Sequence, residues 1–250
     1  LTEVYSSLGL EKPVVKLATR PEKRVGDEAT WDKSEESLRE ALKDLDISFE
    51  ELPGEGAFYG PKIEFHVTDA IGRSWQLGTA QLDFIMPERF ELKYTGEDNQ
   101  DHTPVMIHRA ILGTLERFIG VYIEHRSGHM PTWLAPVQVK VLNITDNHAD
   151  YSQSLVDELK SLGLRAEFDG RSEKLGYKIR EAQVNRTPYI VIVGDNEVDQ
   201  NEVSIRMRGG AQKSGITKEE FVKNVVNEVQ GRELEPRYLN LDESSKEESH

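Results

Sequence analysis

The least polar long run of the chain is VMIHRAILGTLERFIGVYIEHRSG, residues 105–128. A single continuous helix would place His108 and Arg117 on opposite faces, about 13 Å apart along the helix axis. Gly113 divides the run instead. The apolar segment from Val105 to Leu112 is short and bounded by proline and glycine, which predicts a buried strand.

After this glycine, Thr114 can cap a helix. The core side expected for this helix consists of Leu115, Phe118, Ile119 and Tyr122. In such a strand–turn–helix unit, the side chains of His108 and Arg117 can face one cavity.

Residues 49–84 follow a period of two, which is typical of strands with one buried face. Apolar Ile63, Phe65 and Val67 alternate with Glu64, His66 and Thr68. Residues 69–72 supply a turn, so the segment predicts a hairpin of an antiparallel sheet. Its second strand carries Gln76 and Gln81, which regular alternation would place on opposite faces. Gly78 offers a bulge that could bring both glutamines to one face.

Two further elements precede this hairpin. Residues 14–18 predict a short strand, and residues 34–45 predict a helix packed on one side. The apolar positions of that helix are Leu38, Leu42 and Leu45.

The second half of the chain changes its pattern after the segment between Pro131 and Pro136. Strands are predicted over 137–144, 164–168, 187–194 and 202–208, and helices start near residues 146, 171 and 217. Thr217 and Glu220 have the spacing of a capping box. This order predicts an open mixed sheet with helices on its faces.

The chain has 250 residues, a formal net charge of −14 and no cysteine. This length suits two domains that each bury a core. The acidic balance argues weakly against binding nucleic acid through bulk electrostatics, although local basic patches are compatible with it. The lack of cysteine excludes disulfides and thiolate metal ligands. No apolar run approaches about twenty residues and no signal-peptide pattern opens the chain, so we expect a cytoplasmic protein without a membrane span.

The run around Gly113 resembles motif 3 of class II aminoacyl-tRNA synthetases. Further segments resemble, in order, the threonyl branch of that family: KLATRPEKRVG (16–26), GAFYGPKIEF (56–65), SWQLGTAQLDF (74–84), YTGEDN (94–99), MIHRAILGTLERFIG (106–120) and PTWLAPVQV (131–139). Several ordered long motifs are far more specific than one short motif. The resemblance continues to about Arg208, and the opening LTEVYSSLGL begins inside a pattern, so we expect a C-terminal fragment.

The resemblance implies an α/β fold in two parts. Residues 1–134 are expected to form the distal part of the antiparallel class II catalytic sheet, with helices. Residues 135–235 are expected to form an anticodon-binding domain with a mixed five-stranded sheet. Residues 236–250 are polar and acidic, which predicts a disordered tail.

The implied activity is the ATP-dependent activation of threonine to threonyl-AMP, followed by transfer to the cognate tRNA. By resemblance, Arg117 and Lys62 are catalytic, and Arg117 meets the phosphates of ATP, which is used with magnesium. The substrate and ATP pocket is implied to include Tyr59, Lys62, Gln76, Gln81, Thr114 and Arg117. From the pattern alone, hydrogen-bonded structural roles are equally good predictions for Tyr59, Lys62, Gln76 and Gln81.

In the threonyl branch, the histidine of this motif is one of three protein ligands to a zinc ion, which implies His108 as a zinc ligand. From the sequence pattern alone, a histidine in an apolar strand is more often a hydrogen-bonded core residue. The chain also departs from the family pattern here. It has no cysteine. By resemblance, the other two ligands, together with motifs 1 and 2, are expected in segments upstream of Leu1.

The resemblance to the anticodon-binding domain of the threonyl branch implies anticodon reading for Ser172, Arg186, Glu197 and Arg206. Arginine and carboxylate groups suit this role, since they can pair with the edges of unstacked bases. Alternation in EVSIRMR places Arg206, with Ser204 and Arg208, opposite the apolar residues. A partly basic strip is expected along one helix from Lys174, Lys178, Arg180 and Arg186. Ordinary solvated charges remain the alternative for each of these residues.

The resemblance therefore implies part of a threonine–tRNA ligase, with threonine, ATP and threonine tRNA as partners, zinc as cofactor and a homodimer in the full-length enzyme. The alternative is a non-catalytic module for tRNA binding or assembly that lacks motifs 1 and 2.

Overall fold

The computed structural model describes residues 1–239 and divides the chain into two compact units. Unit 1 covers Leu1–His125, and unit 2 begins at Arg126. Residues 126–134, expected in the first domain, group with unit 2. The carbonyl of Met130 accepts a hydrogen bond from Arg208, and that of Thr132 accepts one from Gln138.

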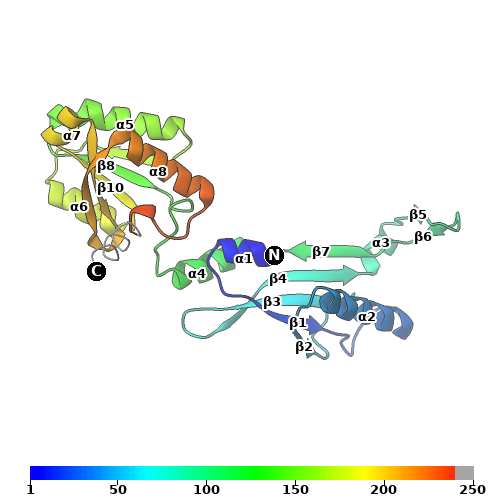
Figure 1. The fold of residues 1–250 in the computed structure, drawn as a ribbon. Coiled ribbons are helices and arrows are strands. Elements are labelled where there is room, and N and C mark those ends of the chain that lie inside the picture. Colours follow the sequence, from blue (N-terminus) through cyan, green and yellow to red (C-terminus); the bar gives the residue numbers. More distant parts are fainter. Residues whose placement is uncertain (240–250) are drawn as a thin grey trace, which may run out of the picture. The chain divides into compact units, whose positions relative to one another are not determined.

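Unit 1 is built on a five-stranded sheet with the order β2-β1-β3-β4-β7 (Figure 1). The pair β1–β2 is parallel and every other pair is antiparallel. Its elements are α1 (Thr2–Ser7), β1 (Val14–Ala18), α2 (Glu28–Asp44), β2 (Phe49–Leu52), β3 (Lys62–Thr68), β4 (Ser74–Asp83), α3 (Ile85–Arg89), β5 (Tyr94–Thr95), β6 (Asp101–His102), β7 (Met106–Ala110) and α4 (Leu115–His125). The predicted hairpin is β3–β4, and β5 pairs separately with β6.

One face of this sheet is apolar because alternate side chains of each strand point to it. Helix α2 covers this face, as Figure 1 shows. The shared core contains Val15, Leu17, Leu38, Leu42 and Ile63. Leu45, expected on the core side, follows the helix and is 70 % exposed. The opposite face of the sheet carries polar side chains.

The bulge expected at Gly78 is confirmed. In the β3–β4 ladder, Gly78 lies opposite Phe65 while Gln76 lies opposite His66, so Leu77 is the additional residue. This shift reverses the alternation of β4 and brings Gln76 to the face that also carries Gln81.

The predicted strand–turn–helix unit is confirmed as β7, Gly113 and α4. The expectation that its strand is buried is wrong, because β7 is an edge strand and Val105 and Ile107 are 51 % and 69 % exposed. Gly113 has φ +68°, and a Cβ at this position would lie 2.5 Å from the carbonyl oxygen of Leu77, so a side chain does not fit here. The predicted core face of α4 is partly wrong. Phe118, Val121 and Tyr122 are buried, but Leu115 and Ile119 are 60 % and 49 % exposed.

Unit 2 contains the expected five-stranded mixed sheet, with the order β12-β11-β10-β8-β9. Strands β8, β9 and β10 are parallel, and β11 and β12 are antiparallel additions. The elements are β8 (Val139–Asn143), η1 (Asp146–His148), α5 (Ala149–Ser161), β9 (Ala166–Asp169), α6 (Leu175–Val184), β10 (Tyr189–Val193), α7 (Asp195–Gln200), β11 (Glu202–Met207), η2 (Arg208–Gly210), β12 (Gln212–Thr217) and α8 (Lys218–Gly231).

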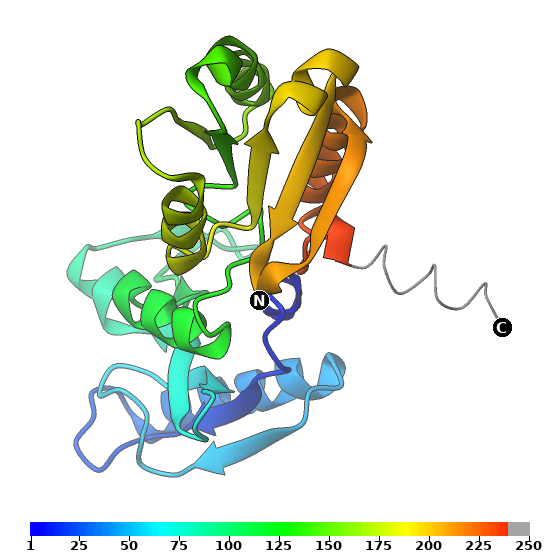
Figure 2. The ribbon, with the colours of Figure 1, turned by 90° about the vertical axis from the view of Figure 1, so that its left-hand side faces the viewer.

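Helices cover both faces of the second sheet. Helices α5 and α8 contribute Leu155 and Phe221 to the larger core on one face, and Figure 2 shows α8 against the sheet. Helix α6 covers the other face through a smaller cluster around Ala182 and Ile190. Tyr238, in the stretch expected to be a disordered tail, is fully buried in the larger core. The rest of that expected tail, residues 240–250, lies outside the described residues.

Within residues 1–239, none of the helices combines the length and apolarity that a membrane crossing requires.

Candidate functional site

The polar face of the first sheet brings together the residues expected to bind substrate. Strand register sets Lys62 opposite Gln81, His66 opposite Gln76, and Gln81 opposite His108. Lys62 and His66 lie four residues apart on β3 and therefore share a face. Lys62, Gln76, Gln81 and His108 thus share this face, because the bulge compensates for the odd spacing of the two glutamines.

Tyr59 joins the face from the loop before β3. Its hydroxyl donates to Gln81 Oε1 at 3.3 Å. The next residue, Gly60, crosses β4 so closely that a Cβ would lie 1.9 Å from the carbonyl oxygen of Leu82. A glycine is therefore required where the loop brings Tyr59 to Gln81.

Glu64 lies between Lys62 and His66 on β3 and was not among the predicted site residues. Its oxygens contact Lys62 Nζ at 2.7 Å and His66 Nε2 at 2.8 Å, and the residue is 5 % exposed. Burial alone would raise the pKa of Glu64, but hydrogen bonds from Lys62 and His66 outweigh burial and hold this pKa below its ordinary value. Glu64 is therefore ionised and orients the Lys62 ammonium group.

His108 is paired with a buried carboxylate that sequence analysis also missed. Its Nε2 lies 2.8 Å from Asp83 Oδ2, and Asp83 is 3 % exposed. Burial would raise the pKa of Asp83, but the backbone N–H groups of Met86 and Ile85 and the His108 ring hold it below its usual value. The one sequence signal for this role of Asp83 is its position two residues after Gln81, which places both side chains on the same face of β4.

Arg117 lies at the other end of the glutamine pair. Its guanidinium donates to the carbonyl of Gln76 at 3.3 Å and lies 5.9 Å from the centre of the Trp75 ring. Gln76 and Gln81 are five residues apart, or roughly 16 Å along an extended strand. Arg117 and His108 therefore flank one elongated polar face without touching each other. Thr114 is exposed, and its carbonyl accepts the first backbone bond of α4 from Phe118.

The donor set around His108 does not make a zinc site by itself. Among the residues that the structure describes, no group of three or more histidine, cysteine, aspartate or glutamate side chains could hold a metal ion. A protein zinc site usually needs about three protein ligands.

In unit 2, the alternation predicted for β11 is confirmed. Val203, Ile205 and Met207 are buried, whereas Arg206 is half-buried. Arg206 lies opposite Gln212 on β12. When the Gln212 amide is turned so that its oxygen faces the guanidinium, this oxygen accepts a hydrogen bond from Arg206 Nε at 3.1 Å. The expectation that Arg208 shares this face is wrong. The strand ends at Met207, and Arg208 is buried. Its guanidinium donates hydrogen bonds to the carbonyl of Met130 and to the carboxylate of Glu235.

Glu197 and Arg206 are placed on neighbouring parts of this surface. Glu197 accepts from the Ser204 hydroxyl at 2.6 Å and from the backbone N–H of Gly194 at 2.8 Å. Ser204 and Arg206 share one face of β11 because they are two residues apart. The Glu197 carboxylate is therefore fixed in position rather than freely solvated. Ser172 is exposed in the loop before α6.

The expected basic strip is wrong at Lys178. This residue is 3 % exposed, and its ammonium donates to Asn143 Oδ1 and to the carbonyl of Asp169, each at 3.0 Å. Arg186 lies beyond the end of α6 with φ +55°, where its guanidinium donates to His129 Nε2 at 3.2 Å. Burial, Arg186 and Arg208 lower the pKa of His129, which favours the neutral ring that accepts this bond.

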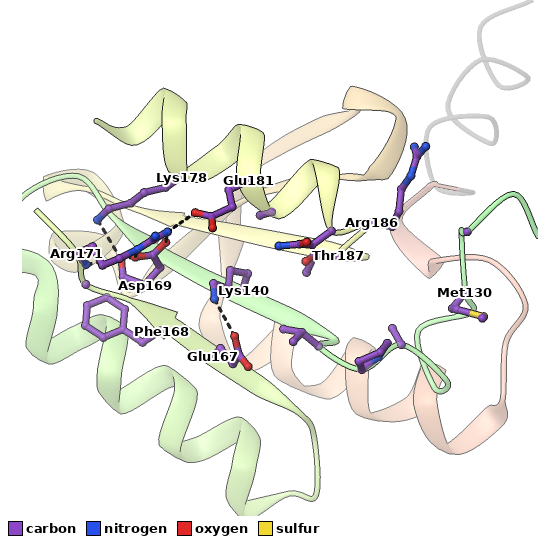
Figure 3. Close-up of a pocket in the computed structure, with 17 residues that line it drawn as sticks. Met130, Lys140, Glu167, Phe168, Asp169, Arg171, Lys178, Glu181, Arg186 and Thr187 are labelled. Carbon is purple, nitrogen blue, oxygen red and sulfur yellow. Dashed lines mark hydrogen bonds and ion pairs between the residues drawn. The ribbon is translucent and has the colours of Figure 1, made fainter. Parts of the chain in front are cut away.

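A cavity of about 600 Å³ lies beside α6, along β8, β9 and the segment around Met130 (Figure 3). Two ion pairs line it, Lys140 with Glu167 at 2.7 Å and Arg171 with Asp169 at 2.6 Å. Arg186 also contributes to its wall. Most lining charges are therefore neutralised in pairs.

Comparison with known proteins relates both units to one enzyme family. A family model described as "tRNA synthetase class II core domain (G, H, P, S and T)" matches residues 1–126. A second model, "Anticodon binding domain", matches residues 138–228. The chain belongs to the class II aminoacyl-tRNA synthetases.

Within the class II synthetases, the similarity is to the C-terminal part of the threonyl branch, which confirms the resemblance seen in the sequence. Threonine–tRNA ligase of Bdellovibrio bacteriovorus is 50 % identical over 235 residues, which cover 94 % of this chain and 36 % of the relative. The chain thus spans about a third of the length of that curated relative.

Solved class II synthetase structures show the same fold. The RNA binding domain of threonyl-tRNA synthetase from Cryptosporidium parvum matches with a TM-score of 0.82 and 36 % identity, covering 89 % of this chain and 56 % of that one. A putative threonyl-tRNA synthetase from Aeropyrum pernix matches with a TM-score of 0.73 and 29 % identity, covering 92 % and 59 %.

Proposed function

We propose that this chain acts as the C-terminal part of a threonine–tRNA ligase, which activates threonine with ATP to threonyl-AMP and transfers it to threonine tRNA. The supporting observation is the polar sheet face shared by Lys62, Gln76, Gln81 and His108, to which Tyr59 is hydrogen-bonded. The proposal extends to a homodimer of the full-length enzyme acting in the cytoplasm.

In this proposal, unit 1 orients the reactants and stabilises charge. Arg117 would meet the phosphates of ATP, which enters with magnesium, because its guanidinium is exposed beside Gln76. Lys62, oriented by Glu64, would donate to a negatively charged oxygen of the adenylate. Tyr59, Gln76 and Gln81 offer the donors and acceptors that a small amino acid with a hydroxyl group requires.

Threonine-dependent exchange of pyrophosphate into ATP by the chain alone separates the two candidate functions. A partial enzyme that retains adenylate formation would exchange pyrophosphate only when threonine is added. A module for tRNA binding would bind RNA without any threonine-dependent exchange. RNA binding without exchange would be compatible with the anticodon proposal and would show that this chain alone does not catalyse adenylate formation.

The isolated chain is expected to hold zinc weakly. His108 is the single ligand implied by resemblance, and affinity falls steeply when a site offers fewer than about three protein ligands. Calorimetric titration with zinc should therefore give no submicromolar site. A tight site that disappears in His108→Ala would contradict this expectation and assign further ligands within the chain.

For unit 2, we propose that Arg206 reads an anticodon base together with Glu197, Arg186 and Ser172. Arg206→Ala is expected to weaken binding of threonine tRNA by about 1 to 3 kcal/mol, the usual cost of a lost specific arginine contact. The fold should change little, because Arg206 points away from the buried residues of β11. Affinities should be measured for this tRNA and for one with altered second and third anticodon bases, at two salt concentrations.

Arg180→Ala provides the matched control, since Arg180 is an exposed cation on α6. It should weaken binding little, and equally for both RNAs, with a shallower salt dependence. An equal loss for both RNAs in Arg206→Ala would show a phosphate contact instead of base reading.

A further inference from the structure

We propose that Asp83 is the positioning residue for His108: it holds the imidazole as the Nε2–H tautomer, so that Nδ1 offers its lone pair at the polar face of unit 1. What this nitrogen meets there rests on the proposed function. The tautomer itself follows from contacts within unit 1.

Asp83 is fixed by the start of α3. Its Oδ1 accepts from the backbone N–H groups of Ile85 at 2.9 Å and Met86 at 3.0 Å. These bonds prevent rotation of the carboxylate and keep it ionised in a site where its side chain is only 4 % exposed. Oδ2 is left to accept from His108 Nε2 at 2.8 Å.

The geometry of the β4–β7 ladder explains why this pair forms. Asp83 lies opposite Met106, and Gln81 lies opposite His108. Asp83 and His108 are therefore diagonal neighbours on one face of an antiparallel pair, a spacing that long side chains bridge. The same register sets His108 beside Gln81, the hydrogen-bond partner of Tyr59.

A neutral imidazole carries one N–H, and its position is set by the stronger acceptor. An ionised carboxylate at Nε2 therefore fixes the proton there. Nδ1 forms no hydrogen bond within residues 1–239, and the His108 side chain is 46 % exposed. A lone pair so presented can accept a hydrogen bond from an ammonium or hydroxyl group of an amino acid.

The chain contains a second histidine–aspartate pair that serves as an internal control. His102 Nε2 lies 2.9 and 3.0 Å from the two oxygens of Asp98. Here the side chains are 44 % and 55 % exposed, so water competes for both partners. The contact distances nearly equal those of His108, but the carboxylate is not enclosed.

Long-range ¹H–¹⁵N correlation spectra of the labelled 250-residue chain test the proposal at a pH of about 8, where histidines are mostly neutral. In the wild type, His108 should prefer the Nε2–H form by about tenfold or more. In Asp83→Asn, the Asn oxygen can keep the backbone bonds while its NH₂ group faces Nε2. His108 should then invert to the Nδ1–H form, the wrong-tautomer effect known from serine-protease triads. Asp98→Asn should leave His108 unchanged.

Asp83→Ser covers the case in which the asparagine variant misfolds, because serine can still cap α3 while removing the carboxylate. The His108 tautomers should then become mixed. An Nδ1–H form in the wild type, or the same tautomer in wild type and folded variants, would overturn the role of Asp83. These spectra do not depend on catalysis, so an absence of pyrophosphate exchange would refute independent activity without touching this proposal.

Discussion

Replacing Trp31 by alanine is expected to lower the free energy of unfolding of unit 1 by about 3 to 5 kcal/mol. Trp31 is fully buried on α2, and its ring meets the edge of Phe84 with centroids 6.1 Å apart. Its Nε1 donates to the carbonyl of Val25 at 2.8 Å. Truncation would therefore open a cavity between α2 and the end of β4 and remove the hydrogen bond to Val25.

Urea denaturation followed by amide hydrogen exchange resolves this effect by unit. Unit 1 should lose protection at lower urea, whereas unit 2 should unfold as in the wild type. Leu45→Ala is the matched control, because Leu45 follows the same helix but is 70 % exposed, and its effect should stay within about 0.5 kcal/mol. Comparable losses from the two substitutions would contradict the packing of α2.

Lys178→Met is expected to destabilise unit 2 by about 2 to 5 kcal/mol. Methionine retains most of the apolar stem but removes the ammonium group. Asn143 Oδ1 and the carbonyl of Asp169 would then be buried without this donor. The three residues belong to α6, β8 and β9, so the loss should appear as a lower urea midpoint for the whole unit.

Lys174→Met separates this buried role from a surface role. Lys174 precedes α6 and is exposed, so its substitution should change stability by no more than about 0.5 kcal/mol. A surface strip containing both lysines would instead predict small stability changes for both, with similar weakening of RNA binding. Equally small losses of stability in the two variants would therefore contradict the buried role of Lys178 and support a basic surface strip along α6.

The α4 helix shows where a pattern is insufficient. Its sequence is apolar around most of its circumference, so a helical period alone could not decide which apolar residues face the core. The structure buries Phe118, Val121 and Tyr122 and exposes Leu115 and Ile119. Which side of α4 is buried therefore depends on its tertiary contacts, such as the hydrogen bond from the Tyr122 hydroxyl to the carbonyl of Leu8.

By itself, the sequence determined the alternation of β3 and β11, the break at Gly113, the mixed sheet of unit 2 and the resemblance to the class II synthetases. These features depend on local periodicity, on glycine conformation and on ordered motifs. Only the tertiary structure decided which partners meet. Asp83 and His108 are 25 positions apart, and Lys178 and Asn143 are 35 apart. Strand register and helix docking bring such groups together. The sequence alone does not show whether a charged side chain is solvated or is buried against a hydrogen-bond partner.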